Sequence, residues 1–474
     1  EISILRNRIH TQTYGIYLNN CAGGDDLENG PGLIANNFVI ATNYGFYLSN
    51  TSYQNYYNNS VNITTSGNSG TIGFYLYNGS SNNVVNNNFV HSGWGMAAQI
   101  YTASAVDMLD YNNYFSNGNY LAAWGTTNYY DLASFTAAST KDEHSISVYP
   151  HYTSSTDLHT MTPWLNAKGT PLAEVTEDMD GEVRDSSTPD IGADEFTPDA
   201  GNTTPLAGHY TIGGTSPDYA TFADAVADLL IKGVSDSVFM DIRNGNYQIH
   251  QVLYTFPGTS MDMPVTFQSE SGNHENVTLY YYASGTSDNY VLYLHGADYV
   301  HFKDLGFSGN TGSEAYSLNL QLSGGVNGFT LMDCSLTGST SGSSYSTLLD
   351  GQNALSMYKL IQGNLFNNGS YGIYISGVNN STAQNQNTMI LNNEFNNQNQ
   401  YFLYITYENS IEITDNVVSA PTGNGAYLNQ CYDEISILRN RIHTQTYGIY
   451  LNNCAGGDDL ENGPGLIANN FVRW

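Results

Sequence analysis

Apolar side chains recur along the chain in short alternating runs, which are separated by turns rich in Asn, Gly and Ser. A tripeptide of Asn, any residue and an apolar residue returns at intervals of 23 to 29 residues, as at Asn364, Asn393 and Asn416. A second motif, an apolar residue followed by Tyr and Leu or Ile, keeps step with it. Two short strands per 23 to 30 residues are typical of one coil of a parallel β-solenoid, so the pattern predicts an all-β fold of that kind.

The recurring Asn predicts a ladder of side-chain amides between neighbouring coils, because the same turn position returns in each coil. By this pattern Asn36, with Phe38 two residues later, and Asn469, with Phe471, hold the ladder position. Cys334 takes the place of Asn once.

Tyrosine occupies the middle of the second motif. Alternation along a strand places Ile16 and Leu18 inside the solenoid and Tyr17 outside. The predicted outer row consists of Tyr17, Tyr47, Tyr75, Tyr374, Tyr404, Tyr427 and Tyr450. Two interpretations of this row stay open. The rings stabilise the solenoid by stacking between coils, or they form an aromatic platform for glycans or for the lateral packing of fibres.

Residues 1–39 return without a change as residues 434–472, at an offset of 433 residues. Packing does not require such identity, because cores and surfaces tolerate substitution. We therefore expect a tandem array with a unit of about 433 residues. Residues 1–197 would be the last coils and end cap of one β-helix, 198–209 a linker rich in Pro, Gly and Thr, and 210–474 the first cap and early coils of the next.

Two segments interrupt the coil pattern. In residues 219–232, Phe222, Val226 and Leu229 have helical spacing, and Thr221 with Asp224 forms a candidate capping box, so a short capping helix is predicted. With the strand and Gly-Asn-Tyr turn that follow, this segment resembles the N-terminal cap of pectin-lyase-like right-handed β-helices. Residues 178–196 resemble the closing segment of right-handed parallel β-helix repeat proteins exported by Bacteroidetes-type bacteria. The resemblance implies a right-handed helix and an extracellular or cell-surface location.

The balance of charge limits the partners. Lys and Arg number 12 against 43 Asp and Glu, which gives a net charge of −31. This field repels nucleic acid and anionic lipids. No apolar run approaches the roughly 18 residues that cross a bilayer, so no membrane span is expected.

Two acidic clusters offer hard oxygen ligands for Ca²⁺, and in both the alternative is a solvated acidic loop. The first contains Asp25, Asp26 and Glu28, and the second contains Asp178, Asp180 and Asp185. No cofactor is required by the sequence. The pair Asp25–Asp26 resembles the paired-Asp element of polygalacturonases, but the other elements of that active site are not found, and we expect the chain not to be an enzyme.

Cys431 and Cys454 follow the tyrosine motif at matching positions 23 residues apart. They should therefore stack in adjacent coils, either as a disulfide or as two thiols.

The sequence thus favours a structural extracellular protein, a fibre, filament or stalk or a surface adhesin, built from tandem β-helix units. Its partners would be itself, by end-to-end continuation that is covalent or by stacking, and possible glycans. The alternative is a secreted protein that binds or cleaves polysaccharides.

Overall fold

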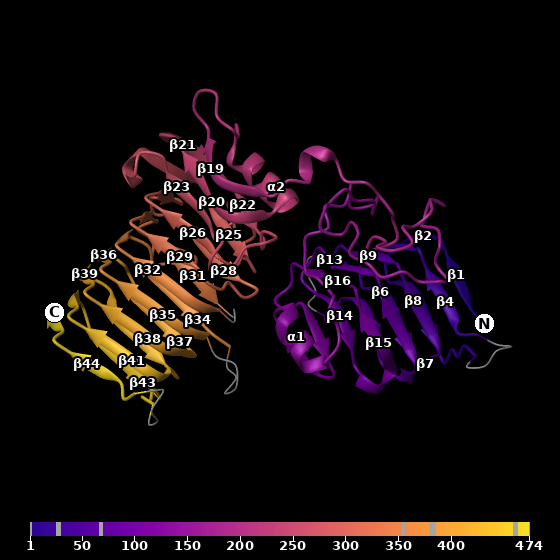
Figure 1. Cartoon of the computed structure of the whole chain (residues 1–474). Coiled ribbons are helices and arrows are strands. Elements are labelled where there is room, and N and C mark those ends of the chain that lie inside the picture. Colours follow the sequence, from indigo (N-terminus) through magenta and orange to yellow (C-terminus); the bar gives the residue numbers. More distant parts are fainter. Residues whose placement is uncertain are drawn as a thin grey trace. The chain divides into compact units, whose positions relative to one another are not determined.

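The structure is a computed structural model that describes residues 2–24, 30–65, 70–352, 356–378, 385–457 and 463–473. The chain forms two compact units, Glu1–Thr204 and Pro205–Trp474, and each is a stack of coils (Figure 1). The division falls within the stretch predicted as a linker, and β19 (Leu206–Ile212) begins inside that stretch.

Unit 1 contains three main sheets, to which each coil contributes one parallel strand, and a two-stranded pair; the last coil adds one further strand that pairs antiparallel with its neighbour in the third sheet. The first sheet contains β1 (Ser3–Leu5), β4 (Gly32–Ala35), β8 (Gln54–Tyr57), β12 (Asn82–Val85) and β15 (Val106–Asp110). The second contains β2 (Arg8–Thr11), β5 (Phe38–Ala41), β9 (Ser60–Ile63), β13 (Asn88–His91) and β16 (Asn113–Ser116). The third contains β3 (Tyr14–Asn19), β6 (Tyr44–Ser49), β10 (Ile72–Leu76), β14 (Met96–Ile100), β17 (Ala122–Trp124) and β18 (Thr127–Tyr129), and the pair is β7 (Thr51–Ser52) with β11 (Gly79–Ser80).

Unit 2 repeats the arrangement over more coils, with sheets of ten, nine and eight strands. The ten-stranded sheet contains β19, β20 (Val234–Ile242), β23 (Val265–Ser269), β26 (Val300–Lys303), β29 (Thr330–Met332), β32 (Met357–Gln362), β35 (Asn385–Leu391), β38 (Glu408–Thr414), β41 (Tyr432–Leu438) and β44 (Leu466–Ala468). The nine-stranded sheet contains β21 (Gly245–Gln248), β24 (Val277–Tyr280), β27 (Gly306–Ser308), β30 (Ser335–Thr337), β33 (Leu365–Asn367), β36 (Glu394–Asn396), β39 (Val417–Ala420), β42 (Arg441–Thr444) and β45 (Phe471–Arg473). The eight-stranded sheet contains β22 (Gln251–Leu253), β25 (Leu292–His295), β28 (Leu320–Ser323), β31 (Thr347–Gln352), β34 (Tyr371–Ser376), β37 (Tyr401–Thr406), β40 (Asn424–Asn429) and β43 (Ile449–Asn452).

The predicted right-handed parallel β-solenoid is confirmed. In the third sheet of unit 1, Ile16 pairs with Phe46 and Phe46 lies beside Phe74, and all three side chains are buried. Tyr17, between Ile16 and the buried Leu18, is 54% exposed, as the alternation predicts. Each coil therefore completes the apolar row of the coil before it, and stacking makes the core continuous.

Among the described residues, both α-helices lie against a solenoid core. The predicted capping helix is α2 (Phe222–Lys232); the Thr221 side chain accepts from the Asp224 amide, the Asp224 side chain bonds back to Thr221, and Phe222 packs on Phe267 of the first coils. The sequence analysis did not predict α1 (Leu132–Ser139) in unit 1, whose Phe135 is fully buried. Within the described residues, neither helix has the length and apolar character needed to cross a membrane.

The asparagine ladder is present, but at a position one residue later than predicted in two coils. It passes through Asn7, Asn37, Asn59, Asn87 and Asn112 in unit 1, and through Asn364, Asn393, Asn416, Asn440 and Asn470 in unit 2. Cys334 precedes the second ladder, since its amide donates to Asn364 Oδ1 at 2.9 Å. Asn36 and Asn469 are instead the preceding corner residues, with φ of 55° and 58°. Asn tolerates this left-handed backbone, so an Asn-Asn pair supplies both the corner and the ladder.

Residues 150–196, here called the cap segment, run along the outer face of unit 1, whereas the sequence suggested a closure of the solenoid end. The segment contacts successive coils: Glu177 O accepts from Asn36, Gly192 O accepts from Asn58, and Thr170 O accepts from Asn86. The corner asparagines of unit 1 therefore hold the cap segment against the solenoid.

Candidate functional site

A strip of partly exposed tyrosines runs along the outer face of the eight-stranded sheet of unit 2. The predicted row of Tyr374, Tyr404, Tyr427 and Tyr450 is present, because these residues are partners in register on β34, β37, β40 and β43. A second column that the sequence analysis missed lies beside it and contains Tyr371, Tyr401 and Tyr447.

The rings of the two columns contact one another along and across the strip. Along the first column the ring centres are 4.8 Å apart from Tyr374 to Tyr404, 4.8 Å from Tyr404 to Tyr427, and 5.4 Å from Tyr427 to Tyr450. Tyr371 lies 5.3 Å from Tyr374 and 5.8 Å from Tyr401. These distances are those of stacked and edge-to-face aromatic pairs, so the rings of neighbouring coils lie in contact with one another.

A small or buried residue follows the first tyrosine of each pair: it is glycine at Gly372 and Gly448, and Phe402 between Tyr401 and Tyr404. In the sequence Tyr-Gly-x-Tyr, as at residues 371–374 and 447–450, the glycine faces the neighbouring coil. A Cβ on Gly372 would lie 2.6 Å from Phe402 O, and a Cβ on Gly448 would lie 2.4 Å from Val472 Cγ1. The two residues between the tyrosines both point inward, so the second tyrosine lies on the same outer face as the first. This motif is the sequence signal from which the second column could have been found.

Unit 1 carries a similar strip over fewer coils. Tyr17, Tyr47 and Tyr75 stack in register at 5.4 and 5.1 Å, and Tyr14 and Tyr44 form the second column. All the predicted outer tyrosines therefore lie on outer sheet faces.

Several tyrosines of the strips have pKa values above the usual range. Burial, followed by the neighbouring tyrosines, raises the pKa of Tyr75 to about 12. Burial also raises the pKa of Tyr374 and of Tyr404. The phenol groups of these residues are therefore neutral hydrogen-bonding groups on an aromatic surface.

Polar side chains continue the first column of unit 2 beyond Tyr374. Asp350 is in register with Tyr374, and Gln321 is in register with Asp350. Asp350 Oδ2 accepts from Gln352 Nε2 at 3.0 Å, whereas its buried Oδ1 has no hydrogen-bond partner among the described residues. Burial raises the pKa of Asp350 to about 6. One carboxyl group thus lies at the end of an uncharged aromatic surface.

The second predicted calcium cluster is not brought together as a set of ligands. Asp178 is fully buried, and it accepts from the amides of Asp180, Glu182 and Glu195 at 2.8 to 3.0 Å. Asp185 accepts from the amides of Ser187 and Thr188. These carboxylates therefore stabilise turns of the cap segment.

Asp180 belongs to a different group, with His159 and Asp194, whose possible ligand atoms lie within 4.8 Å of one another. Asp180 already bonds to Arg8 at 2.9 Å and to His159 at 2.7 Å. The first predicted cluster, Asp25, Asp26 and Glu28, lies outside the described residues. Calcium binding by the chain stays a prediction.

Cys431 and Cys454 lie in adjacent coils as predicted, and both are free thiols in the structure. Cys431 is fully buried, and the hydrogen bond between the two side chains lowers the pKa of Cys454 and raises that of Cys431. A disulfide between the two residues stays a prediction.

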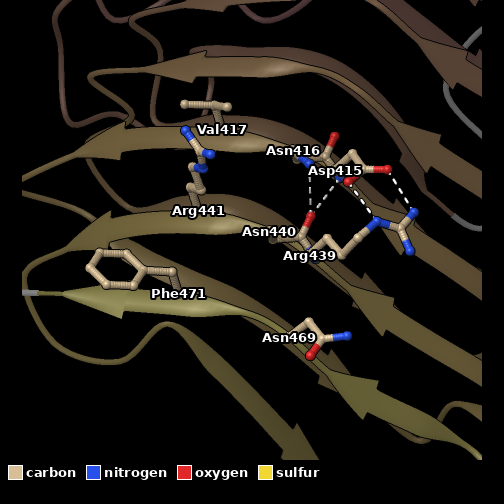
Figure 2. A pocket seen from close by; sticks show the side chains of 8 residues that line it. All are labelled: Asp415, Asn416, Val417, Arg439, Asn440, Arg441, Asn469 and Phe471. Carbon is tan, nitrogen blue, oxygen red and sulfur yellow. Dashed lines mark hydrogen bonds and ion pairs between the residues drawn. The ribbon is translucent and has the colours of Figure 1, made fainter.

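The nine-stranded sheet of unit 2 carries a groove on its outer face. Its volume is about 420 Å³, and Figure 2 shows its lining residues: Asp415, Asn416, Val417, Arg439, Asn440, Arg441, Asn469 and Phe471. Arg439 donates to both carboxylate oxygens of Asp415, at 2.8 and 2.7 Å. The groove therefore combines apolar side chains with arginines.

These coils and sheets define a right-handed parallel β-helix protein, and residues 319–464 match the family model described as the right handed beta helix region. Among solved structures, the pectin methylesterase from Aspergillus niger is similar over 56% of this chain and 91% of its own, with 14% identity and a TM-score of 0.34. The alginate lyase from Paenibacillus sp. is similar over 56% of this chain and 100% of its own, with 11% identity and a TM-score of 0.33. A PL6 family alginate lyase is similar over 99% of this chain and 69% of its own, with 10% identity and a TM-score of 0.35. No curated protein sequence matches the chain.

Proposed function

We propose that this protein binds an extended, uncharged polysaccharide along its tyrosine strips, outside the cell. The observation that carries the proposal is the tyrosine strip of unit 2. Its first column has a tyrosine on each of the four successive strands β34, β37, β40 and β43, and its second column adds Tyr371, Tyr401 and Tyr447, with Asn424 in register on β40.

The chemistry of the strip matches that of a sugar polymer. A sugar ring has an apolar C–H surface and a rim of hydroxyl groups, and tyrosine offers an aromatic body with a hydroxyl tip. Solenoids present extended surfaces along their axis, so a polymer can contact several coils at once. Each contact adds a small free energy, and the sum supports binding without a deep pocket.

The charge of the protein favours a neutral polymer. With a net charge of −31, the chain repels polyanions over several ångströms.

The structural fibre or adhesin remains the second candidate, and the exact duplication of residues 1–39 as 434–472 favours it. Glycan binding and a fibrous form are compatible, because a longer stack of coils extends the binding surface.

The binding test uses the full chain and insoluble neutral glycans (cellulose, xylan, mannan), with pectate and alginate as charged comparisons. We expect retention on at least one neutral glycan, and an affinity reduced tenfold or more in Y404A/Y427A. The matched control is Y282A/Y345A, which removes two tyrosines that are 57% and 51% exposed outside the strip.

Y404F/Y427F retains the rings and should lose less affinity than the alanine variant, while melting curves verify that each variant is folded. Equal binding by the strip and control variants, or no retention of the folded protein on any neutral glycan, would contradict the proposal. Release of reducing ends, measured in the same samples, distinguishes binding from cleavage.

A further inference from the structure

The tyrosine strip of unit 2 has a counterpart on an earlier coil of the same sheet. Tyr290 and Tyr293 repeat the spacing of Tyr371 and Tyr374, and their ring centres lie 5.5 Å apart. Tyr293 lies on β25 and Tyr374 on β34, and the strands β28 and β31 separate them in the sheet. An aromatic pair therefore lies on each side of an interval of two coils.

Polar side chains fill this interval in register with the tyrosines. Gln321 on β28 is in register with Tyr293 on one side and with Asp350 on the other. Asp350 on β31 is in turn in register with Tyr374. A polymer that follows the first column past Tyr374 therefore crosses two polar coils before it reaches the next aromatic pair.

A serine and a histidine lie in hydrogen-bond contact in the same interval. Ser323 and His295 are in register on β28 and β25, and each lies two residues after a residue of the first column, so they share its face of the sheet. Ser323 Oγ lies 2.9 Å from His295 Nδ1, and the hydroxyl oxygen of Tyr293 lies 2.5 Å from Ser323 Oγ. When the Tyr293 hydroxyl donates to Ser323, the Ser323 hydroxyl is left to donate to His295 Nδ1. A hydroxyl nucleophile and a base are thus in contact.

The backbone after the serine is shaped to admit the imidazole. Gly324 follows Ser323 with a φ of 71°, and a Cβ on Gly324 would lie 3.2 Å from His295 Cε1. Glycine at this turn therefore leaves room for the ring beside the serine. Ser323 and His295 are each only 6% exposed, so packing fixes the contact between them.

We propose that Ser323 and His295 hydrolyse an ester-linked acyl group on a neutral polysaccharide that lies along the tyrosine strip. The identity of the substrate rests on the proposed function, because the strip would present the polymer to this interval. The sequence analysis expected no enzyme, since the elements of a polygalacturonase site are not found. Ester hydrolysis requires a different set of groups, a nucleophile with an adjacent base, and these two side chains supply it.

The reaction proceeds through an acyl group on the serine. Ser323 Oγ attacks the carbonyl carbon while His295 Nδ1 takes the hydroxyl proton, and the Tyr293 hydroxyl shifts its hydrogen bond from Ser323 to the carbonyl oxygen. The bond between the acyl carbon and the sugar oxygen breaks, and the sugar oxygen receives the proton from His295. Water then attacks the acyl carbon and gives a proton to His295, which returns it to Ser323 Oγ as the carboxylic acid leaves. Water is the only co-reactant, and the polymer keeps its length.

The test follows two reactions of the full chain: release of 4-nitrophenol from 4-nitrophenyl acetate, and release of acetate from acetylated xylan. We expect S323A and H295A to slow both reactions at least about tenfold. S376A is the matched control and should react at the wild-type rate. Ser376 follows Tyr374 by two residues on the same face, but its hydroxyl accepts from Thr406 at 2.9 Å.

A fluorophosphonate probe, which labels activated serines, gives a second measurement on the wild-type protein, so it does not depend on the folding of a variant. Peptide mass spectrometry should locate the label on Ser323, and H295A should reduce the labelling. Melting curves verify that each variant is folded.

The outcomes separate this site from glycan binding. Hydrolysis of the small ester that is lost in S323A supports the site even where no glycan retains the protein. Turnover of the small ester without acetate release from the polymer would overturn the substrate. Equal rates for S323A and the wild-type protein on the small ester, or no label on Ser323, would overturn the catalytic site itself.

Discussion

Phe38 is 1% exposed and Phe471 is 64% exposed, although they occupy the same position in two identical segments of 39 residues. The neighbouring arginines differ in the same way. Arg6 bonds to Glu177 of the cap segment, whereas its counterpart Arg439 bonds to Asp415 of the preceding coil. The local sequence fixes the coil and its register in both copies, while the segments packed outside the coil decide which side chains are buried.

Removal of the phenyl ring should separate the two copies most clearly. We expect F38A to destabilise unit 1 by about 3–5 kcal/mol, because it leaves a cavity under the cap segment. F471A should change stability by only about 0.5 kcal/mol or less at low protein concentration, as an exposed site does. Calorimetric unfolding of the two variants measures the difference. Equal shifts in the two variants would show that the cap segment does not bury Phe38.

Removal of the ladder asparagine should also destabilise the first copy more than the second, but the difference in unfolding free energy should be smaller than for the phenylalanine. Asn37 is fully buried and bonds to Asn7 and Asn59, whereas Asn470, its counterpart, is partly exposed and bonds to Asn440. We expect N37A to cost about 2–3 kcal/mol, because it leaves buried amide groups without partners, and N470A to cost about 1 kcal/mol. Denaturant unfolding measures both, and a larger loss for N470A would contradict the assignment.

Lowering the pH from 8 to 5 should stabilise unit 1, with the smallest effect of the three. Burial raises the pKa of Asp190 to about 7 and of Asp194 to about 6, so the native state binds these protons more tightly than the unfolded state. The protonated carboxyl groups therefore stabilise the native state at low pH. This stabilisation is lost as the pH rises through the raised pKa values. The pKa of His159 is raised by Asp180 and Asp157 against the effect of burial, which adds a contribution of the same sign.

Melting temperatures measured across this pH range check the expectation. D194N should reduce the change in melting temperature between pH 8 and pH 5. D185N is the matched control: hydrogen bonds from backbone amides lower the pKa of Asp185, so its contribution changes only at more acidic pH. A melting temperature that is constant from pH 8 to 5 would show that these carboxyl groups are not buried as described.

The predictable part of the structure is the part that repeats. Alternation around Tyr17 and Tyr427 predicted the facing of the strands, and the capping box at Thr221 predicted the start of α2. Both signals are local, so a single stretch of sequence contains them. The second tyrosine column was missed because Tyr371 and Tyr374 are three residues apart, a spacing that would place them on opposite faces of a regular strand.

The sequence by itself determined the coil period, the parallel stacking, the inward and outward faces and the duplicated segment. Each follows from side-chain periodicity and turn chemistry within one or two coils. Only the tertiary structure decided that Asn37 and not Asn36 forms the ladder, that Asp178 caps turns, and that residues 150–196 lie along the outside of unit 1. These features join residues up to about 170 positions apart in the chain, as Arg8 and Asp180 show. Phe38 and Phe471 lie in identical segments, so the sequence around them cannot predict that one is buried and the other exposed. Burial depends on which other segment packs against the side chain.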